Sequence, residues 1–304
     1  MRPKFFSRFK RAARALDPRA GADVEMTYQV GGLEIRLPLN HALPDYQSKF
    51  RLYDKFLPHV AATLDERGVI VDIGANVGDT TVLLSQYCNN DILCIEPDDK
   101  YYGFLKRNIR DMGLDSRVTL SKSAVGEKGV SVSLERSAGT ARPIQSDDGS
   151  GIGLVSLGSV LRKAGLYDRD ISLIKVDTDG LDYSILDNSI PILEEKKPIV
   201  YWENTVETHE QLISSNNTIN GLTAIGYTDF SCFDNFGSLV SGRCDAEVLG
   251  KINEYLLFQA KAGQVAVFYV DIMAWCSTDR DRAGEALKRF REFAGSNERW
   301  PQKS

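Results

Sequence analysis

Short, mostly apolar runs alternate with helical stretches from residue 69 onward, and this alternation constrains the fold more than any other feature. The runs VIVDI, ILCIE and ISLIKVD, at 69–73, 92–96 and 171–177, have the length of buried strands. Strands buried on both faces and joined by helices form a parallel sheet with helices on either side. Later runs at 227–233 and 265–273 predict antiparallel closing strands. The sequence therefore predicts a doubly wound, Rossmann-like α/β sheet.

The chain divides into four predicted parts. Alternation around Gly31-Gly32 predicts a β-hairpin, and the helical spacing of 46–65 predicts one or two helices. The glycine- and serine-rich stretch 126–153 predicts a short hairpin and a mobile loop, in which 135–152 is either a lid or a solvated segment. The four parts are a basic arm (1–20), a cap of hairpin and helices (21–65), the α/β domain (66–278), and a C-terminal helix and tail (279–304).

Composition indicates the size of the core, the cellular compartment and the role of the cysteines. At 304 residues with 42% hydrophobic content, the chain can bury an enzyme-sized core. It contains neither an apolar stretch of about 20 residues nor the apolar run of a secretory signal. A cytosolic protein is therefore expected. The five cysteines show no paired ligand spacing, so neither disulfides nor structural zinc is predicted.

Charge is distributed unevenly along the chain. Residues 1–20 contain seven Lys or Arg and one Asp, so the rest is more acidic than the net charge of −5 suggests. An acidic body is a poor partner for nucleic acid. The basic arm has two interpretations: an amphipathic helix that contacts an anionic membrane peripherally, or a solvated terminus.

The turn after the first predicted strand, 72–80, is the candidate ligand site, because ligands of such sheets bind at the carboxyl ends of the strands. A dinucleotide fingerprint requires three glycines from Gly74 onward, and this chain has Asn76 and Asp79 at the second and third places. Asp72 and Asp79 would also repel a pyrophosphate. S-adenosylmethionine carries an ammonium and a sulfonium but no phosphate, so it fits this turn better.

A second acid supports a nucleoside ligand. Glu96 ends the second strand, where a carboxylate accepts hydrogen bonds from ribose hydroxyls in nucleoside-binding α/β folds. Ser123 and Ala124, after the third strand, are the predicted adenine edge. The predicted cofactor-binding residues are Asp72, Gly74, Ala75, Asn76, Gly78, Thr80, Glu96, Pro97, Ser123, Ala124 and Asp177.

These residues resemble the class I S-adenosylmethionine-dependent methyltransferases, and within them the FkbM-type family. The resemblance spans about residues 50–275 and rests on VDIGANVGDTT (71–81), IEPD (95–98), Arg107-Asn108 and LIKVDTDGLDYSIL (173–186). It implies a seven-stranded methyltransferase sheet and methyl transfer to hydroxyl oxygens of sugars or of secondary metabolites such as macrolides. The family usually has glutamates at the places of Asp179 and Asp182.

Methyl transfer to an alcohol requires removal of a proton, by a general base or with the help of a metal. The catalytic candidates are Asp177, Asp179 and Glu203, with Glu203 and Asp179 competing for the role of base. Asp177, Glu203 and Asn204 also resemble the magnesium site of catechol O-methyltransferases, and oxygen ligands suit Mg²⁺. Other interpretations stay open: Asp177 contacts only the cofactor, Glu203 acts without metal, and Asn204 caps a turn.

Several further side chains have two interpretations each. His41 is the histidine best placed to act as a base, although a lone histidine is more often a packing residue. Three residues of the entry helix either touch the cofactor carboxylate or serve packing: Tyr46, Lys49 and Tyr53. Trp202 is expected in the core. Four residues either bind a pyranose or belong to a half-buried strand and its end: Tyr227, Phe230, Phe233 and Asn235.

The predicted function is S-adenosylmethionine-dependent O-methylation of a small-molecule or glycan hydroxyl, with a sugar or glycan precursor as the acceptor. One alternative is O-methylation of a macrolide-like metabolite, whose pocket would be apolar. Another is a nucleoside-binding scaffold without catalysis. An NAD-dependent oxidoreductase is disfavoured by the missing glycines. The sequence predicts no oligomeric state.

Overall fold

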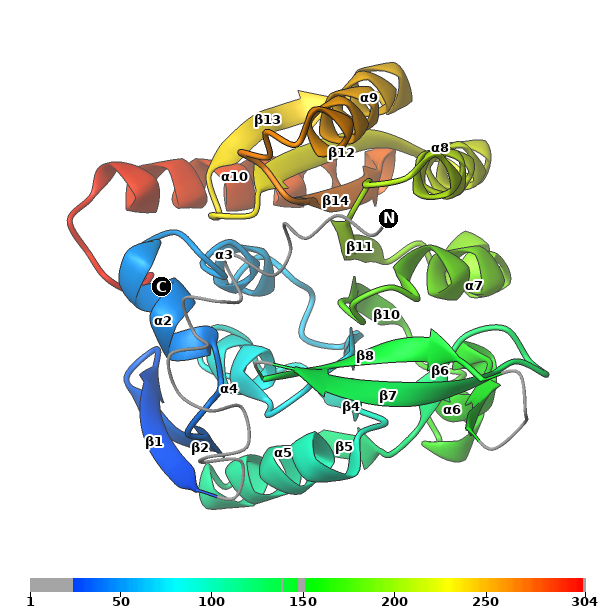
Figure 1. The fold of residues 1–304 in the computed structure, drawn as a ribbon. Coiled ribbons are helices and arrows are strands. Elements are labelled where there is room, and N and C mark those ends of the chain that lie inside the picture. The colour runs from blue at the N-terminus through cyan, green and yellow to red at the C-terminus, as the bar shows by residue number, and fades with distance from the viewer. Residues whose placement is uncertain (1–23, 138, 147–150, 303–304) are drawn as a thin grey trace.

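The computed structural model describes residues 24–137, 139–146 and 151–302. The predicted basic arm and its membrane contact lie outside these residues. An eight-stranded sheet in the order β13-β12-β14-β11-β10-β3-β4-β5 forms the centre of the molecule (Figure 1). Its strands are β3 (Val69–Ile73), β4 (Ile92–Ile95), β5 (Val118–Ser121), β10 (Ile171–Val176), β11 (Ile199–Asn204), β12 (Tyr227–Asp234), β13 (Leu239–Cys244) and β14 (Val270–Cys276).

The predicted α/β class is confirmed, with one more strand in the sheet than the seven expected. Strands β3, β4, β5, β10 and β11 are parallel, whereas β14, β12 and β13 pair antiparallel. The additional strand is β13, which pairs with β12 at the edge of the sheet. The predicted closing strand 265–273 begins earlier than the observed β14, because the first residues of the predicted run, 265–269, do not pair in the sheet.

Helices cover both faces of the sheet and enclose a separate core on each side (Figure 1). One face is covered by α3 (Leu57–Ala61), α4 (Asp79–Leu84), α5 (Asp99–Asp111) and α10 (Arg280–Gly295). The other is covered by α6 (Leu157–Lys163), α7 (Asp182–Lys196), α8 (His209–Ala224) and α9 (Ala246–Ala262). No helix in the described part of the chain has the length and apolar character needed to span a membrane.

The N-terminal hairpin and the helix after it are present as predicted. β1 (Glu25–Val30) pairs antiparallel with β2 (Leu33–Pro38), and α2 (Leu43–Lys49) follows. Asn108 attaches the hairpin to the core: its Oδ1 accepts from Arg36 N at 2.8 Å, and its Nδ2 donates to Arg36 O at 2.9 Å and to Val77 O at 2.7 Å. One buried amide thus joins the hairpin, α5 and the turn after β3.

A second, four-stranded sheet lies beside the main one. It consists of β6 (Ala124–Val125), β7 (Ser131–Ser137), β8 (Thr140–Gln145) and β9 (Ile152–Val155), in the order β6-β9-β7-β8. The predicted short hairpin is β7–β8, and Figure 1 shows it in green, crossing in front of β4. Most of the described part of the candidate lid, 135–152, is therefore strand.

Candidate active site

Two connected pockets lie at the carboxyl edge of the parallel strands. The small pocket is lined by the ends of β3 and β4 and by Glu96, Pro97, Ser123 and Ala124. The large cavity, of about 240 Å³, is lined by α2, the start of α4, the ends of β10 and β11, and the start of β14. Four residues line both: Gly74, Asn76, Asp177 and Asp179. The structure thus brings most of the predicted site residues to one place.

The turn after β3 requires glycine for steric reasons. A Cβ on Gly74 would lie 1.9 Å from the carbonyl oxygen of Asp177, and the residue has a φ of +83°. Ile95 O accepts hydrogen bonds from Gly74 N at 2.9 Å and from Ala75 N at 3.1 Å. Gly78, with a φ of +85°, packs against Leu105. Ala75 and Gly78 line neither pocket, so they shape the turn without facing a ligand.

Glu96 is positioned by two backbone amides at the floor of the small pocket. Its oxygens accept from Asn76 N at 2.9 Å and Asp98 N at 2.8 Å, and the residue is only 4% exposed. Burial raises the pKa of its carboxyl to about 7. Each carboxylate oxygen has a second lone pair, so Glu96 can still accept hydrogen bonds from two ligand hydroxyls.

Asn76 connects three distant segments. It has a left-handed φ of 50°, which asparagine tolerates better than most residues. Its Nδ2 donates to Gly139 O at 2.9 Å, and its Oδ1 lies 3.4 Å from His41 Nε2. Burial lowers the pKa of His41 to about 4. His41 therefore stays neutral near pH 7 and holds the cap loop against the turn.

The prediction that Asp72 faces the ligand is wrong. Its side chain is fully buried beneath the turn and lines neither pocket. Lys175, its neighbour in the β3–β10 register, places Nζ 3.3 Å from Asp72 Oδ1 and 3.1 Å from Asp177 Oδ2. Burial lowers the pKa of Lys175, but the attraction of Asp177 and Asp72 outweighs it and the pKa lies well above its usual range. Because Lys175 compensates Asp72, Asp72 does not contribute to the expected repulsion of a pyrophosphate.

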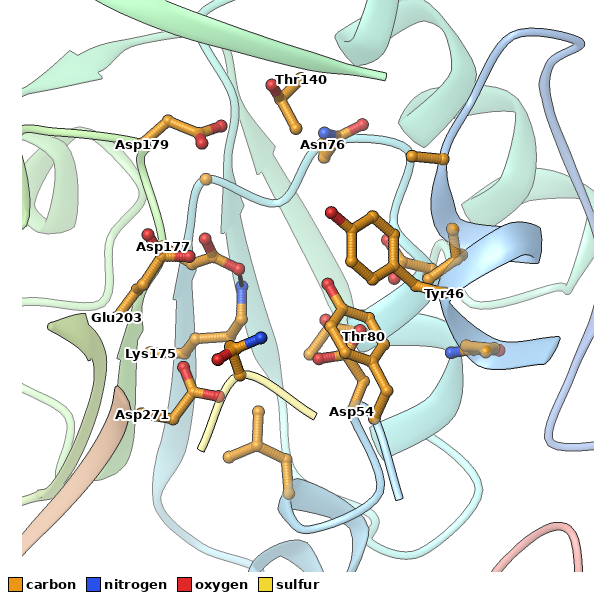
Figure 2. Close-up of a pocket in the computed structure, with 18 of the residues that line it drawn as sticks. Tyr46, Asp54, Asn76, Thr80, Thr140, Lys175, Asp177, Asp179, Glu203 and Asp271 are labelled. Atoms are coloured by element: carbon orange, nitrogen blue, oxygen red, sulfur yellow. Dashed lines mark ion pairs between the residues drawn. The ribbon is translucent and has the colours of Figure 1, made fainter. Parts of the chain in front are cut away.

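Six carboxyl groups line the large cavity, together with many apolar and aromatic side chains. Figure 2 shows Glu203, Asp177 and Asp271 on one side and Asp54 with Tyr46 on the other. Glu203 and Asp271 are paired residues of β11 and β14, so strand pairing sets them side by side. Burial, followed by the charges of Asp177 and Asp179, raises the pKa of Glu203 well above its usual range. Glu203 can therefore take up a proton inside the cavity.

Two of these acids could not be predicted as site residues. Asp271 lies on the last strand of the sheet, and burial raises its pKa well above the usual range. Asp54 lies in a left-handed turn with a φ of 57°. Although it is exposed to the cavity, the protein around it desolvates its carboxyl and raises the pKa to about 7. Asp79, at the start of α4, has its pKa raised to about 6, with burial as the main cause.

Asn204 lies away from the cavity, so the predicted magnesium set is not assembled. Successive residues of a strand point to opposite faces, and Asn204 therefore faces away from Glu203. Its Oδ1 accepts from the hydroxyls of Tyr183 at 3.2 Å and Ser215 at 2.5 Å, and its Nδ2 donates to Asn253 Oδ1 at 2.8 Å. Over the described ranges, no group of three or more His, Cys, Asp or Glu is placed to hold a metal ion.

Asp182 and Asp179, the two departures from the family pattern, differ in their surroundings. Asp182 accepts from Thr178 N at 3.1 Å and Gly180 N at 3.1 Å, so it braces the turn before α7. Burial raises its pKa to about 6. Asp179 has a left-handed φ of 56° and lines both pockets. The shorter Asp182 is thus structural, and Asp179 remains a candidate for contact with a ligand.

The aromatic residues of the cavity differ from those predicted to bind a pyranose, but they include Tyr46 and Tyr53, the two tyrosines predicted as candidates for cofactor contact. Three of the four predicted residues belong to the core, since Tyr227, Phe230 and Phe233 are at most 1% exposed. Asn235 does line the cavity, together with Thr80, and Trp202 is buried as expected. Lys49 is exposed, and its Nζ lies 3.7 Å from Asp45 Oδ2. The rings that face the cavity are those of Tyr46, Phe50, Tyr53, Tyr201, Phe236, Phe268 and Tyr269.

A match to a family model identifies the chain. Residues 72–225, about half of the sequence, match the methyltransferase FkbM domain. The chain belongs to the FkbM methyltransferase family. It is therefore a methyltransferase, as the motifs of the turn and of β10 predicted. No curated protein matches it.

Solved structures similar to this FkbM-domain chain are distant. Precorrin-6y C5,15-methyltransferase from Geobacter metallireducens GS-15 has 14% identity over 73% of this chain and 85% of that chain, with a TM-score of 0.39. M. jannaschii TYW2, in complex with AdoMet, has 13% identity over 84% and 86%, with a TM-score of 0.43. Methyltransferase FkbM from Methylobacillus flagellatus KT has 14% identity over 76% of this chain and 50% of that chain, with a TM-score of 0.37.

Proposed function

We propose that this methyltransferase uses S-adenosylmethionine to methylate a hydroxyl oxygen of a sugar or glycan precursor. The observation that supports the proposal is the junction of the two pockets at Gly74, Asn76, Asp177 and Asp179. A nucleoside held in the small pocket would direct the rest of the cofactor into the large cavity, where the carboxyl groups lie.

The residues of the site fit S-adenosylmethionine. Glu96 is a buried carboxylate able to accept from ribose hydroxyls, and Gly74 leaves room for a close approach where a Cβ would not fit. Asp54 and Asp79 are carboxyls near the start of α4, suited to an ammonium group. The bound cofactor supplies a methyl group on a positively charged sulfur, which an acidic cavity stabilises.

Glu203 is the proposed general base. It lines the cavity beside Asp177, and its raised pKa increases its affinity for a proton. Thr205 Oγ1 donates to Glu203 Oε1 at 2.9 Å, which leaves Oε2 to take the proton of the acceptor hydroxyl. As the carbon–sulfur bond breaks and the carbon–oxygen bond forms, that proton passes to Glu203. Asp179 is the competing base, since it also lines the cavity.

The size of the cavity favours a small acceptor group. Its volume of about 240 Å³ is below the roughly 300–1,000 Å³ of pockets that enclose drug-sized ligands. A single sugar ring is closer to this size than a macrolide body. The lining also combines carboxyl groups with aromatic rings such as Tyr46, and these suit the hydroxyls and the C–H face of a pyranose respectively.

Cofactor binding is the first test. Calorimetric titration of the full chain with S-adenosylhomocysteine and, separately, with NAD⁺ should give binding of the first only. Glu96→Gln should weaken binding at least about tenfold, because the amide cannot replace both acceptors. Glu127→Gln, at an exposed glutamate, is the matched control. Absence of binding in the wild type would favour a scaffold without catalysis.

Methyl transfer is the second test. Release of S-adenosylhomocysteine would be measured with a panel of pyranosides and, in parallel, with macrolides. Glu203→Gln should lower the rate by at least about a hundredfold while leaving S-adenosylhomocysteine affinity nearly unchanged, and Asp179→Asn separates the two candidate bases. Turnover of macrolides but not pyranosides would refute the sugar assignment while leaving the enzyme class intact.

A further inference from the structure

The β7–β8 hairpin forms an outer wall of both pockets. Leu134 of β7 and its cross-strand partner Pro143 of β8 line the small pocket, together with Ala141. Ser137 and Thr140, closer to the tip, line the large cavity. A ligand that occupied both pockets would therefore lie between this hairpin and the strand ends.

Two contacts of different chemistry hold the hairpin in place. Asn76 Nδ2 donates to Gly139 O at 2.9 Å, next to the tip. Arg136 Nε donates to Asp98 Oδ2 at 2.7 Å, and the carboxylate of Asp98 is only 2% exposed, whereas the arginine side chain is 51% exposed. The hairpin is thus attached to a buried acid by a side chain that reaches in from the surface.

Asp98 connects this arginine to Glu96. Its Oδ1 caps α5 by accepting from Lys100 N at 2.9 Å and Tyr101 N at 3.2 Å, which leaves Oδ2 for Arg136. Its backbone N–H donates to Glu96 Oε1 at 2.8 Å. A movement of Asp98 would therefore move both the hairpin and the carboxylate at the floor of the small pocket.

We propose that Arg136 is a positioning residue for cofactor binding. It holds the hairpin wall against the nucleoside and, through Asp98, fixes the orientation of Glu96. This inference rests on the proposed function, because it takes S-adenosylmethionine or its product as the occupant of the small pocket. Because the β7–β8 hairpin must move away before a ligand can leave the small pocket, the attachment of the hairpin affects mainly the dissociation rate of the ligand.

Arg142→Gln provides a matched control for Arg136→Gln. Both arginines lie on the same hairpin and are exposed, and both changes remove one positive charge. Arg136→Gln should weaken S-adenosylhomocysteine binding by about fivefold, with most of the change in the dissociation rate, whereas Arg142→Gln should change it by less than about twofold. Arg136→Lys keeps the charge and should recover part of the affinity.

Two further measurements separate positioning from a general effect of charge or folding. Higher salt should accelerate dissociation from the wild type more than from Arg136→Gln, because salt weakens an ion pair whose arginine is exposed to solvent. Hydrogen exchange should show protection of 131–137 and 140–145 by S-adenosylhomocysteine in the wild type and in Arg142→Gln, and less in Arg136→Gln.

The outcomes are distinguishable. Equal affinities and dissociation rates for Arg136→Gln and Arg142→Gln, whether both unchanged or both weakened, would overturn the role of Arg136. Ligand binding without any protection of the hairpin would overturn its assignment as a wall. A wild-type protein that binds no S-adenosylhomocysteine would overturn the proposed function instead.

Discussion

Replacing Lys175 by methionine should destabilise the protein more than replacing both members of its buried ion pair. The variant leaves Asp72, which is fully buried, without the ammonium that lies 3.3 Å away. Removing one partner of a buried ion pair typically costs about 3–5 kcal/mol, because an uncompensated charge remains. Thr81 Oγ1 still donates to Asp72 at 2.8 Å, which places the expected loss near the lower end, about 3 kcal/mol.

The double variant Asp72→Asn/Lys175→Met removes both charges and should lose only about 1 kcal/mol, which is about 2 kcal/mol less than the loss in Lys175→Met. The second contact of Lys175, with Asp177, is lost in both variants, so it cancels in the comparison between them. Urea unfolding of the wild type, both single variants and the double variant gives the four free energies of unfolding that the double-mutant cycle requires.

The single and double variants together provide an internal check on this reasoning, because only Lys175→Met leaves the charge of Asp72 without the ammonium of Lys175. Equal losses for the single and double variants at about pH 8 would show that Asp72 and Lys175 do not depend on each other.

Three other changes have defined outcomes. Under the proposed function Glu96 must ionise to accept fully from ribose, and its pKa is about 7, so S-adenosylhomocysteine affinity should rise at least about tenfold between pH 6 and pH 8, as calorimetry would show. The rise should be smaller in Glu96→Gln, where only Asp54 and Asp79 still ionise in this range. Gly74→Ala should lower the unfolding free energy by at least about 2 kcal/mol, since its Cβ would clash with Asp177, whereas Gly103→Ala, in an open position of α5, should raise it by about 0.5 kcal/mol in urea unfolding. Asn204→Ala should cost about 2 kcal/mol of stability by the same assay but leave S-adenosylhomocysteine affinity within about twofold, because its hydrogen bonds lie away from the cavity.

The strand ends could be predicted because periodicity alone locates them. Glu96, Ser123 and Ala124 follow apolar runs of strand length, and the structure places all three in the small pocket. Gly74 was predictable for a similar reason, since a glycine directly after a buried strand indicates a close backbone approach. Such features depend on a few neighbouring residues, so the sequence displays them directly.

Residue type at a strand end did not reveal which way a side chain points. Asp72 and Asn204 both lie at the ends of buried strands, but one is buried beneath the turn and the other faces the opposite side of the sheet from Glu203. Strand alternation would have separated Glu203 from Asn204, because consecutive residues cannot share a face. The pairing of Asp72 with Lys175 needed the register between β3 and β10, which periodicity does not supply.

The remaining lining residues come from segments without periodic signals. Phe50 and Asp54 lie in turns around the cap helices, and Phe236 follows β12. Their place in the cavity depends on contacts between parts of the chain that are far apart in sequence. The aromatic residues of the run 227–233, such as Tyr227 and Phe230, are core residues because β12 is buried on both faces.

The position of β14 between β11 and β12 determines when the central sheet can be completed during synthesis of the chain. β12 pairs only with β13 and β14, so until residues 270–276 have been synthesised that hairpin has no strand to join it to the rest of the sheet. During this time β11 carries an unpaired edge, which favours association with other chains. Asp271 arrives with the same strand, opposite Glu203. On the ribosome, the large cavity is therefore among the last parts of the protein to form, because the side of it that Asp271 lines is absent until β14 has been synthesised.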